Sequence, residues 1–439
     1  MKRVILLTGF TVACFLGSIA QKTPGEKPIS TTGKDVIKGF MDKRFGMFIH
    51  WGPITLRGTE IGWSRGHEVP VEDYDNLYKE FNPVLFNADT WVKAAKDAGM
   101  KYITFTSKHH DGFCMWPSAF TQYDIQSTQY KKDIVGEIAK ACKKQGIAFC
   151  LYFTILDWHD TNYPLHNLGD SIPDPKSNMG AFVQTMKNEL TELVTNYHPY
   201  MIWFDGNWEE PWTKSYGQEI YTHLKRLDAN LIINNRLGKG SHKVMSAASV
   251  GDYTTPEQEI GNLNMDTPWE SCITICDQWA WKPNDKMKTL QECLQTLIKT
   301  ASGNGNLLLN VGPMPDGRME QRQVNQLKKI GDWLKIYGES IYGTAGGPYA
   351  PNDNYSATRK DTRVFIHIFN TANKEIVLPV LPGVKLLSAK LMNGPAVKVQ
   401  AKDDNYYFTL PAQLPDNNSN VLVLQLDKQA IDLPIIDSK

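Results

Sequence analysis

Two acidic residues stand where a pair of carboxyl groups could act on one bond. Asp205 ends the apolar run 201–205 and precedes Gly206, so we expect a carboxylate at the end of a buried strand, beside backbone that a ligand can approach. Glu270 follows Trp269, and an adjacent indole can desolvate a carboxyl group and raise its pKa. Retaining hydrolysis of a glycosidic bond needs one carboxylate that attacks carbon and one carboxyl group that donates and then removes a proton. The pair is a candidate for this chemistry, with Asp205 as a possible nucleophile and Glu270 as the best candidate for the general acid/base.

On chemistry alone the second carboxyl group stays open. Other glutamates lie in apparent loops and could serve equally: Glu60, Glu68, Glu209, Glu210, Glu257 and Glu259. A lone aspartate at a strand end can also cap the following helix. Arg236, after two asparagines, could hold Asp205 ionised through its charge, or could be a surface turn residue.

Three histidines also follow apolar runs, namely His50, His109 and His110. Each can donate and accept hydrogen bonds, which suits the hydroxyl groups of a sugar. The adjacent histidines and Asp111 also resemble the ligand-rich loops of metallohydrolases. Adjacent side chains on an extended strand point to opposite faces, however, which disfavours joint coordination by His109 and His110. We therefore predict hydroxyl binding, with no metal and no other cofactor.

These residues need a scaffold that brings several strand ends together. Between residues 40 and 345, short apolar runs alternate with amphipathic stretches. The runs are 45–51, 102–106, 148–154, 201–205, 231–235, 272–275 and 307–311, and the stretches include 90–98, 134–144, 182–195, 219–227 and 290–300. Apolar strands separated by helices indicate a parallel sheet covered on both faces. We predict an α/β fold with a (β/α)8-like, TIM-type barrel, whose active site lies at the carboxyl ends of the strands.

The pattern changes after residues 346–348, Gly-Gly-Pro. Short runs with strand character follow, separated by turn signals such as Asn-Gly-Pro at 393–395 and by no helical stretch. This favours a C-terminal antiparallel β-sandwich. We predict domains at 21–345 and 346–439, and we favour a structural cap on the barrel over a carbohydrate-binding module for the second.

Composition limits the partners. Lys plus Arg and Asp plus Glu number 47 each, so no overall charge draws the chain to nucleic acid or to an anionic membrane. Aromatic residues make up 11% of the chain, with 12 tryptophans. This suits carbohydrate, because sugar rings offer C–H faces for stacking and hydroxyls for polar side chains.

Residues 1–20 have the pattern of a Sec signal peptide, with two basic residues, an apolar stretch and a Ser-Ile-Ala end. The apolar stretch is shorter than the roughly 20 residues of a spanning helix. We expect export, to the periplasm, without stable membrane insertion. A surface lipoprotein anchored at Cys14 is less favoured, because Thr11 stands where a branched apolar residue is usual. The other cysteines could form disulfides in an exported protein, but their pairing does not follow from sequence.

Six segments of the barrel region form a distinctive set, namely FGMFIHWGP (45–53), KHHDGFCMW (108–116), IWFDG (202–206), NNRLG (234–238), PWESCITI (268–275) and GNGNLLLNVGPMPDG (303–317). Together they resemble the glycoside hydrolase family 29 α-L-fucosidases. The resemblance implies a retaining, exo-acting fucosidase that acts on fucosylated oligosaccharides or glycoconjugates, with Asp205 as nucleophile and Glu270 as acid/base. A non-catalytic fucose-binding barrel and a metal-dependent hydrolase stay as alternatives.

The resemblance also implies which residues hold the sugar: His50, His109, His110, Trp203 and Arg236. We expect the methyl group of fucose against an aromatic side chain, either Trp203 or Trp116. Many family members carry a Glu-Trp pair after the first strand, and here two residues separate Glu60 from Trp63. Both are kept as candidate sugar contacts.

Overall fold

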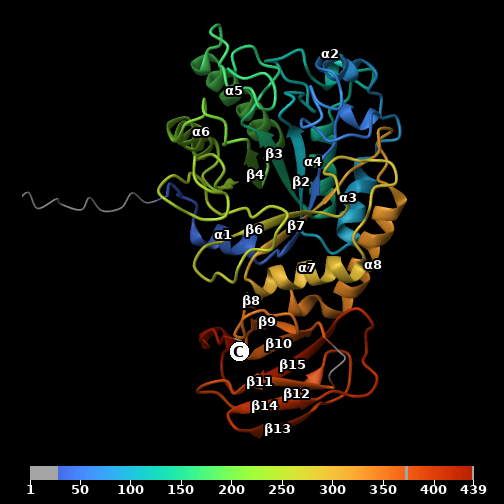
Figure 1. Cartoon of the computed structure of the whole chain (residues 1–439), viewed down its shortest axis with the longest axis vertical. Coiled ribbons are helices and arrows are strands. Elements are labelled where there is room, and N and C mark those ends of the chain that lie inside the picture. Colours follow the sequence, from blue (N-terminus) through green and yellow to red (C-terminus); the bar gives the residue numbers. More distant parts are fainter. Residues whose placement is uncertain (1–27, 371–373, 438–439) are drawn as a thin grey trace, which may run out of the picture.

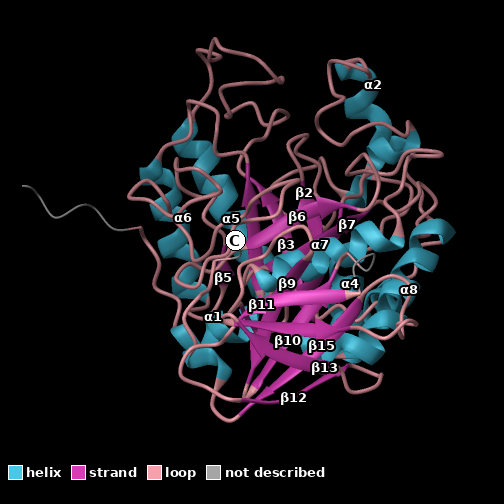
Figure 2. Cartoon of the chain, turned by 60° about the horizontal axis from the view of Figure 1, so that its bottom comes forward, coloured by secondary structure: helices cyan, strands magenta, loops and turns pink. Residues whose placement is uncertain are grey.

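The computed structural model describes residues 28–370 and 374–437, and its larger part is a curled parallel sheet flanked by helices (Figures 1 and 2). The predicted signal peptide lies outside the described residues. The sheet has seven strands in the order β5-β4-β3-β2-β1-β7-β6. These strands are β1 (Phe45–Ile49), β2 (Tyr102–Lys108), β3 (Ala148–Thr154), β4 (Met201–Asp205), β5 (Ile232–Ile233), β6 (Glu270–Thr274) and β7 (Asn306–Val311).

Helices surround this sheet, most of them on its outer side, while Phe40 of the first helix packs against the cluster inside the barrel. They are α1 (Lys34–Met41), α2 (Val71–Asn76), α3 (Ala88–Asp97), α4 (Ile134–Gln145), α5 (Met179–Tyr197), α6 (Lys214–Leu227), α7 (Leu290–Ser302) and α8 (Gln321–Tyr337). Short 3-10 helices are η1 (Pro53–Leu56), η2 (Leu77–Lys79), η3 (Ile125–Ser127), η4 (Gly338–Ser340) and η5 (Ala430–Asp432). The starts of α3, α4, α5, α6 and α7 follow from the sequence, because a side chain accepts a first-turn N–H at Asn87, Asp133, Asn178, Thr213 and Thr289.

The barrel closes between β5 and β6 through an irregular segment. Residues 253–257 make isolated parallel bridges to both sides, from Tyr253 to Asn234 and from Thr254 to Trp269. A third bridge joins Glu257 to Cys272 of β6. In the described chain no helix lies between β5 and β6. The predicted (β/α)8-like barrel is confirmed, with a long loop in place of one of its helices.

Side chains on alternate strand positions fill the inside of the barrel. Tyr152 of β3 and Trp203 of β4 stack there at 5.7 Å between ring centroids. Phe48, Cys272 and Leu308 belong to the same interior cluster. The intervening residues pack outward against the helices. This alternation places polar residues at the strand ends around the barrel mouth.

The C-terminal part forms two antiparallel sheets, which confirms the predicted β-sandwich. One has the order β12-β15-β10-β9-β8 and the other β11-β14-β13. Their strands are β8 (Ala345–Gly346), β9 (Tyr355–Lys360), β10 (Arg363–Ile368), β11 (Glu375–Pro379), β12 (Leu386–Leu391), β13 (Lys398–Lys402), β14 (Asn405–Thr409) and β15 (Asn420–Leu426). The predicted domain boundary falls inside β8, and the division of the chain at this strand stays our proposal.

The sandwich packs beneath α7 and α8, at the end of the barrel away from the loop that carries α2 (Figure 1). Trp333 of α8 donates its indole N–H to the carbonyl of Ser419 at 3.2 Å. Phe365, Val421 and Val423 join the outer core of the barrel. Since the barrel mouth faces the other way, the sandwich contributes no side chain to the site described next.

Two further features bear on the sequence predictions. Within the described residues, no helix is both long enough and apolar enough to cross a membrane. The six cysteines of the described chain are all buried free thiols.

Candidate active site

Asp205 is the last residue of β4, and its carboxylate lies at the barrel mouth. All five residues of the strand are buried, and 9% of Asp205 is exposed. The chain turns away at Gly206 with φ of 97°, where a Cβ atom would lie 2.6 Å from Leu156. Glycine is therefore required, because L-residues rarely adopt this backbone conformation and no space exists for a side chain.

Three side chains surround the Asp205 carboxylate. Arg236 donates from Nη1 to Oδ1 at 2.6 Å, and Tyr152 donates its hydroxyl to Oδ2 at 3.3 Å. Nε2 of His110 lies 3.7 Å from Oδ2. The salt bridge to Arg236 and the hydrogen bond from Tyr152 hold the carboxylate in one position, facing the mouth of the barrel.

The same guanidinium binds a second carboxylate. Arg236 donates from Nη2 to Oε2 of Glu257 at 2.8 Å, and its Nε donates to the hydroxyl of Thr255 at 2.8 Å. Burial alone would lower the pKa of Arg236, but the charges of Asp205 and Glu257 outweigh this and raise it. The Glu257 side chain is 35% exposed at the mouth. Asp205, Arg236 and Glu257 are called the Asp205 cluster below.

Glu270, the predicted acid/base, lies elsewhere. It is the first residue of β6, is 0% exposed, and accepts a hydrogen bond from the hydroxyl of Tyr102 at the start of β2. The hydroxyl of Tyr253 donates to its other oxygen at 3.4 Å. Burial raises the pKa of Glu270 to about 8, although Tyr102, Trp203 and Tyr253 partly offset this. The carboxyl group is enclosed inside the barrel below Trp203, so no leaving group can reach it.

The second carboxyl group beside Asp205 is therefore not that of Glu270. Trp269 does not desolvate Glu270, because its own indole points outward and donates to the carbonyl of Gly303. Glu257, one of the open alternatives, shares Arg236 with Asp205. The span of one guanidinium suits the roughly 5 to 5.5 Å that separates the carboxyl groups of retaining glycosidases.

The three predicted histidines converge on the pocket as neutral rings. Nδ1 of His50 pairs with Oδ1 of Asn310 at 2.7 Å, and Nδ1 of His110 pairs with the hydroxyl of Thr154 at 2.7 Å. Burial lowers the pKa of His50 and of His110 to about 3, and lowers that of His109 well below its ordinary value. Within the described structure, Nδ1 of His109 and Nε2 of His110 lack a hydrogen-bond partner. Neutral imidazoles with free nitrogens suit hydroxyl groups.

The expectation that His109 and His110 face opposite ways is wrong. They follow β2 in a turn rather than continuing the strand, and their ring centroids lie 4.3 Å apart. The ring of His109 stacks on Tyr152 at 5.2 Å. No group of His, Cys, Asp and Glu in the described part of the chain is arranged to hold a metal ion.

The predicted aromatic contacts divide between the pocket and the outer core. Trp203 lies under Arg236, whose guanidinium carbon is 4.4 Å from its ring centroid. Trp63 meets His110 edge-on at 5.2 Å, at the rim of the pocket. Trp116 is 0% exposed on the outer side of the sheet and donates to Glu192 of α5 at 3.1 Å. Trp116 is therefore not a sugar contact, because its segment turns outward from the barrel toward α5.

Glu60 has a positioning role in this geometry. Its carboxylate accepts the backbone N–H groups of Trp279 at 2.8 Å and Ala280 at 2.9 Å. Burial raises its pKa, although these backbone hydrogen bonds partly offset the rise. The loop held in this way brings the Trp279 ring to 4.8 Å from His50. Glu60 shapes the pocket wall through Trp279 instead of presenting free oxygens to a sugar.

Three pocket residues were missed in the sequence, namely Tyr152, Asn310 and Trp279. Tyr152 and Asn310 had a usable signal, because each is a polar-tipped residue within an apolar run and lies on the inward side by the alternation of a strand. Trp279 had none, since its place depends on the distant Glu60.

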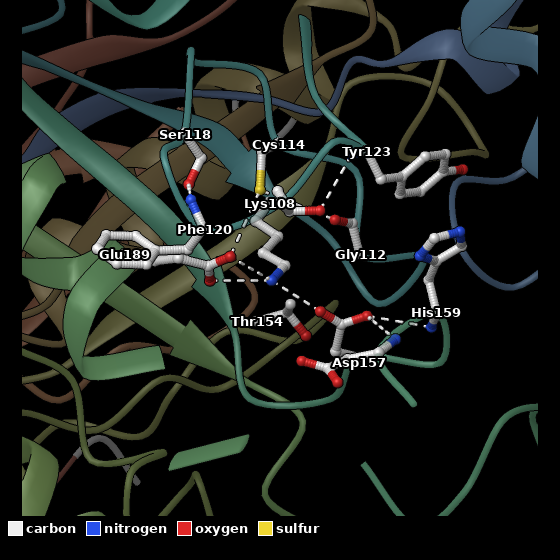
Figure 3. Close-up of polar contacts among 12 residues, drawn as sticks. Lys108, Gly112, Cys114, Ser118, Phe120, Tyr123, Thr154, Asp157, His159 and Glu189 are labelled. Carbon is white, nitrogen blue, oxygen red and sulfur yellow. Dashed lines mark hydrogen bonds and ion pairs between the residues drawn. The ribbon is translucent and has the colours of Figure 1, made fainter. Parts of the chain in front are cut away.

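A second ionic group joins Lys108, the residue before His109, to Asp157 and Glu189 (Figure 3). Lys108, the last residue of β2, binds Oδ2 of Asp157 at 2.7 Å and both oxygens of Glu189 at 2.9 and 3.1 Å. These three residues are called the Lys108 cluster below. The backbone N–H of Trp158, next to Asp157, donates to the carbonyl of His110 at 3.0 Å. The cluster thereby fixes the turn that carries the two histidines.

Comparison with known proteins points to one family. The model of the α-L-fucosidase family matches residues 17–339. The tissue α-L-fucosidase of Mus musculus is 31% identical over 330 residues, which cover 70% of this chain and 71% of that protein. The plasma α-L-fucosidase of Homo sapiens is 30% identical over 330 residues, covering 70% and 69%.

Solved structures agree with this result. α-L-Fucosidase isoenzyme 1 of Paenibacillus thiaminolyticus superposes with a TM-score of 0.82 at 32% identity, covering 90% of this chain and 99% of that one. A family 29 α-L-fucosidase of Bacteroides thetaiotaomicron gives a TM-score of 0.84 at 27% identity, covering 92% and 100%. That structure holds a covalent intermediate, trapped with 2-fluoro-fucosyl fluoride in a glutamate-to-glutamine variant.

Proposed function

The chain belongs to the α-L-fucosidase family, glycoside hydrolase family 29, and from that premise we propose that Asp205 is its nucleophile and Glu257 its general acid/base. The enzyme is a retaining glycoside hydrolase that removes terminal α-L-fucose. One observation carries the residue assignment, which is that Arg236 bridges the two carboxylates at 2.6 and 2.8 Å. Asp205 lies deep in the pocket and Glu257 lies at its open edge, as attack on carbon and protonation of a departing group require.

The two steps follow from these positions. Asp205 attacks the anomeric carbon of fucose, while Glu257 transfers its proton to the glycosidic oxygen and the bond to the leaving group breaks. Glu257, now ionised, then takes a proton from water, whose oxygen attacks the same carbon and releases Asp205. Arg236 keeps both groups in place through the cycle. The covalent intermediate of the Bacteroides relative supports this route.

Uncharged side chains of the pocket recognise the sugar. His50, His109 and His110 can each give or take a hydrogen bond, which matches hydroxyl groups that do both. Trp203 and Trp279 offer apolar surface for the methyl group that distinguishes fucose from sugars with a hydroxymethyl group. A neutral pocket wall suits a neutral substrate.

Azide rescue tests the assignment, because the configuration of the product reports which carboxylate is missing. In Asp205→Gly, azide should occupy the vacated face and yield the inverted β-fucosyl azide from an activated fucoside. In Glu257→Ala, a dinitrophenyl fucoside should still form the intermediate, and azide should capture it as the α-fucosyl azide.

Two matched variants complete this experiment. Glu259→Ala removes an exposed carboxylate two residues away that binds Lys243, and it should keep full activity without azide dependence. Glu270→Gln should also show no azide product. If Glu270→Gln is rescued with retention and Glu257→Ala is not, the acid/base assignment to Glu257 is wrong and the original one returns.

We also propose export to the periplasm through residues 1–20, supported by their basic, apolar and small-residue pattern. The mature protein should begin at Gln21 and appear in the osmotic-shock fraction of cells. Retention of residue 1 in a cytoplasmic fraction would contradict the proposal, and a lipid-modified Cys14 would favour the surface lipoprotein.

A further inference from the structure

Trp208 differs from every other tryptophan of this chain in its exposure. The chain has 12 tryptophans, and Trp208 is 43% exposed whereas the other 11 are buried or half-buried. A large apolar ring in water is unfavourable. An exposed ring at the mouth of a pocket therefore suggests a binding surface.

The ring of Trp208 is held in one orientation. One face stacks on Trp63 at 5.7 Å with 21° between the planes, and the rings of Trp208 and His110 lie at right angles with centroids 5.4 Å apart. Since Trp63 covers one face, the exposed area belongs to the opposite face and the rim. The indole forms a shelf beside the pocket.

The backbone under this shelf is fixed on both sides. Nζ of Lys239 donates to the carbonyls of Trp208 at 3.3 Å and Glu209 at 3.0 Å. The Glu209 carboxylate accepts from the indole of Trp158 at 3.1 Å and from the hydroxyl of Tyr163 at 2.5 Å. The shelf is thus built before a ligand arrives, and binding to it costs little ordering of the protein.

The Trp208 ring contacts the ring of His110, which in turn lies beside Asp205. His110, which touches Trp208, has its Nε2 3.7 Å from Oδ2 of Asp205. A fucose unit attacked by Asp205 fills the pocket, so the group attached to it emerges at the mouth. Tryptophan offers a flat apolar face that matches the C–H face of a pyranose ring.

We infer that Trp208 is the platform on which the first sugar ring of the leaving group stacks. The inference rests on the proposed role of Asp205 and extends it by naming a residue that selects a pyranose leaving group over a small one. Trp208 is a specificity residue for the bond to be cleaved, while the histidines recognise fucose.

Two substrates separate this role from a contribution to the fucose pocket. α-L-Fucosyl fluoride has a single atom as leaving group, whereas a fucosylated disaccharide has a sugar ring. In Trp208→Ala, kcat/KM for the disaccharide should fall about tenfold further than kcat/KM for the fluoride, the size expected for truncating one tryptophan at a contact surface. Trp208→Phe should recover part of this difference.

Phe120→Ala is the matched control, because Phe120 is also an exposed aromatic residue, at 46%, but lies on the flank near Glu189. It should leave the ratio between the two substrates unchanged. An equal loss on both substrates in Trp208→Ala would mean that Trp208 only supports His110, and no loss on either would mean that the shelf is empty during catalysis; both outcomes overturn the inference. Failure of the wild-type enzyme on both substrates would instead overturn the proposed function.

Discussion

Two clusters of charged side chains lie at neighbouring strand ends, and each holds one cation between two carboxylates. In the Asp205 cluster, the guanidinium of Arg236 contacts one oxygen of Asp205 and one of Glu257. The side chains of these two acids are 13% and 35% exposed. Each carboxylate therefore keeps an oxygen that no cation occupies, at a mouth that a sugar can enter.

The Lys108 cluster has the same charges in a closed setting. The side chains of Asp157 and Glu189 are 5% and 1% exposed, and Lys108 binds both oxygens of Glu189. Burial would lower the pKa of Lys108, but the two carboxylates raise it well above its ordinary value. In our proposal, the same three charges thus serve the reaction where they are open and positioning where they are enclosed. The exposure of the carboxylates and their oxygen atoms that contact no cation distinguish the two clusters, whereas the formal charges are the same.

The largest expected effect would come from changing the proposed nucleophile of the open cluster. Asp205→Asn keeps the shape of the side chain but removes its charge, so no covalent intermediate can form. Turnover of an aryl α-L-fucoside should fall about 10⁴-fold or more, while the thermal midpoint changes little. Steady-state kinetics and thermal unfolding measure the two quantities. Turnover within tenfold of the wild type would remove Asp205 from the reaction.

The next largest effect is expected when the cation of the closed cluster is removed. Lys108→Met leaves two carboxylates buried without a cation, which should lower the free energy of unfolding by about 3 to 5 kcal/mol. Urea denaturation measures this change. Lys93→Met is the control, because its ion pair with Asp97 is exposed on one helix and should matter by less than about 0.5 kcal/mol. Similar losses in both variants would show that enclosure does not distinguish the clusters.

Exchanging the type of cation sharpens the comparison further. Arg236 reaches two carboxylates with two nitrogen atoms, which a single ammonium group cannot reproduce. In Arg236→Lys the charge stays, but the positions of Asp205 and Glu257 shift, and kcat/KM should fall about 100-fold. Kinetics on the aryl fucoside test this. A change of less than about threefold would mean that the charge alone matters in the open cluster.

The parts of the fold that rest on local patterns were predictable. The strands 148–154 and 201–205 have the predicted bounds, because apolar β-forming runs end there in polar residues or turns. β5 is shorter than predicted, with only Ile232–Ile233 paired in the sheet. The chain leaves the sheet there so that Arg236 can reach across to the mouth.

The acid/base residue that we propose was not predictable in this way. Glu257 reaches the mouth because residues 253–257 insert between β5 and β6, a long-range pairing without a periodic signal. The Trp269-Glu270 pair offered an attractive local environment, but the strand turns Glu270 into the closed barrel. Trp116 failed for a similar reason, since closeness to the histidines along the chain did not place it on the same side of the sheet.

Glu270 supplies the last and smallest test, because it is an enclosed carboxyl group with no cation beside it. Burial raises its folded pKa from 4.5 to about 8, so the native protein keeps a proton that the unfolded chain releases above about pH 4.5. Its contribution to stability is therefore complete at low pH and is lost as the pH rises toward 8. Relative to Glu270→Gln, the wild type should lose about 2 kcal/mol of unfolding free energy between about pH 5.5 and about pH 7, as measured by urea denaturation. Glu259→Gln, at an exposed site, should follow the wild type, and parallel curves for wild type and Glu270→Gln would show that Glu270 titrates as an open carboxylate does.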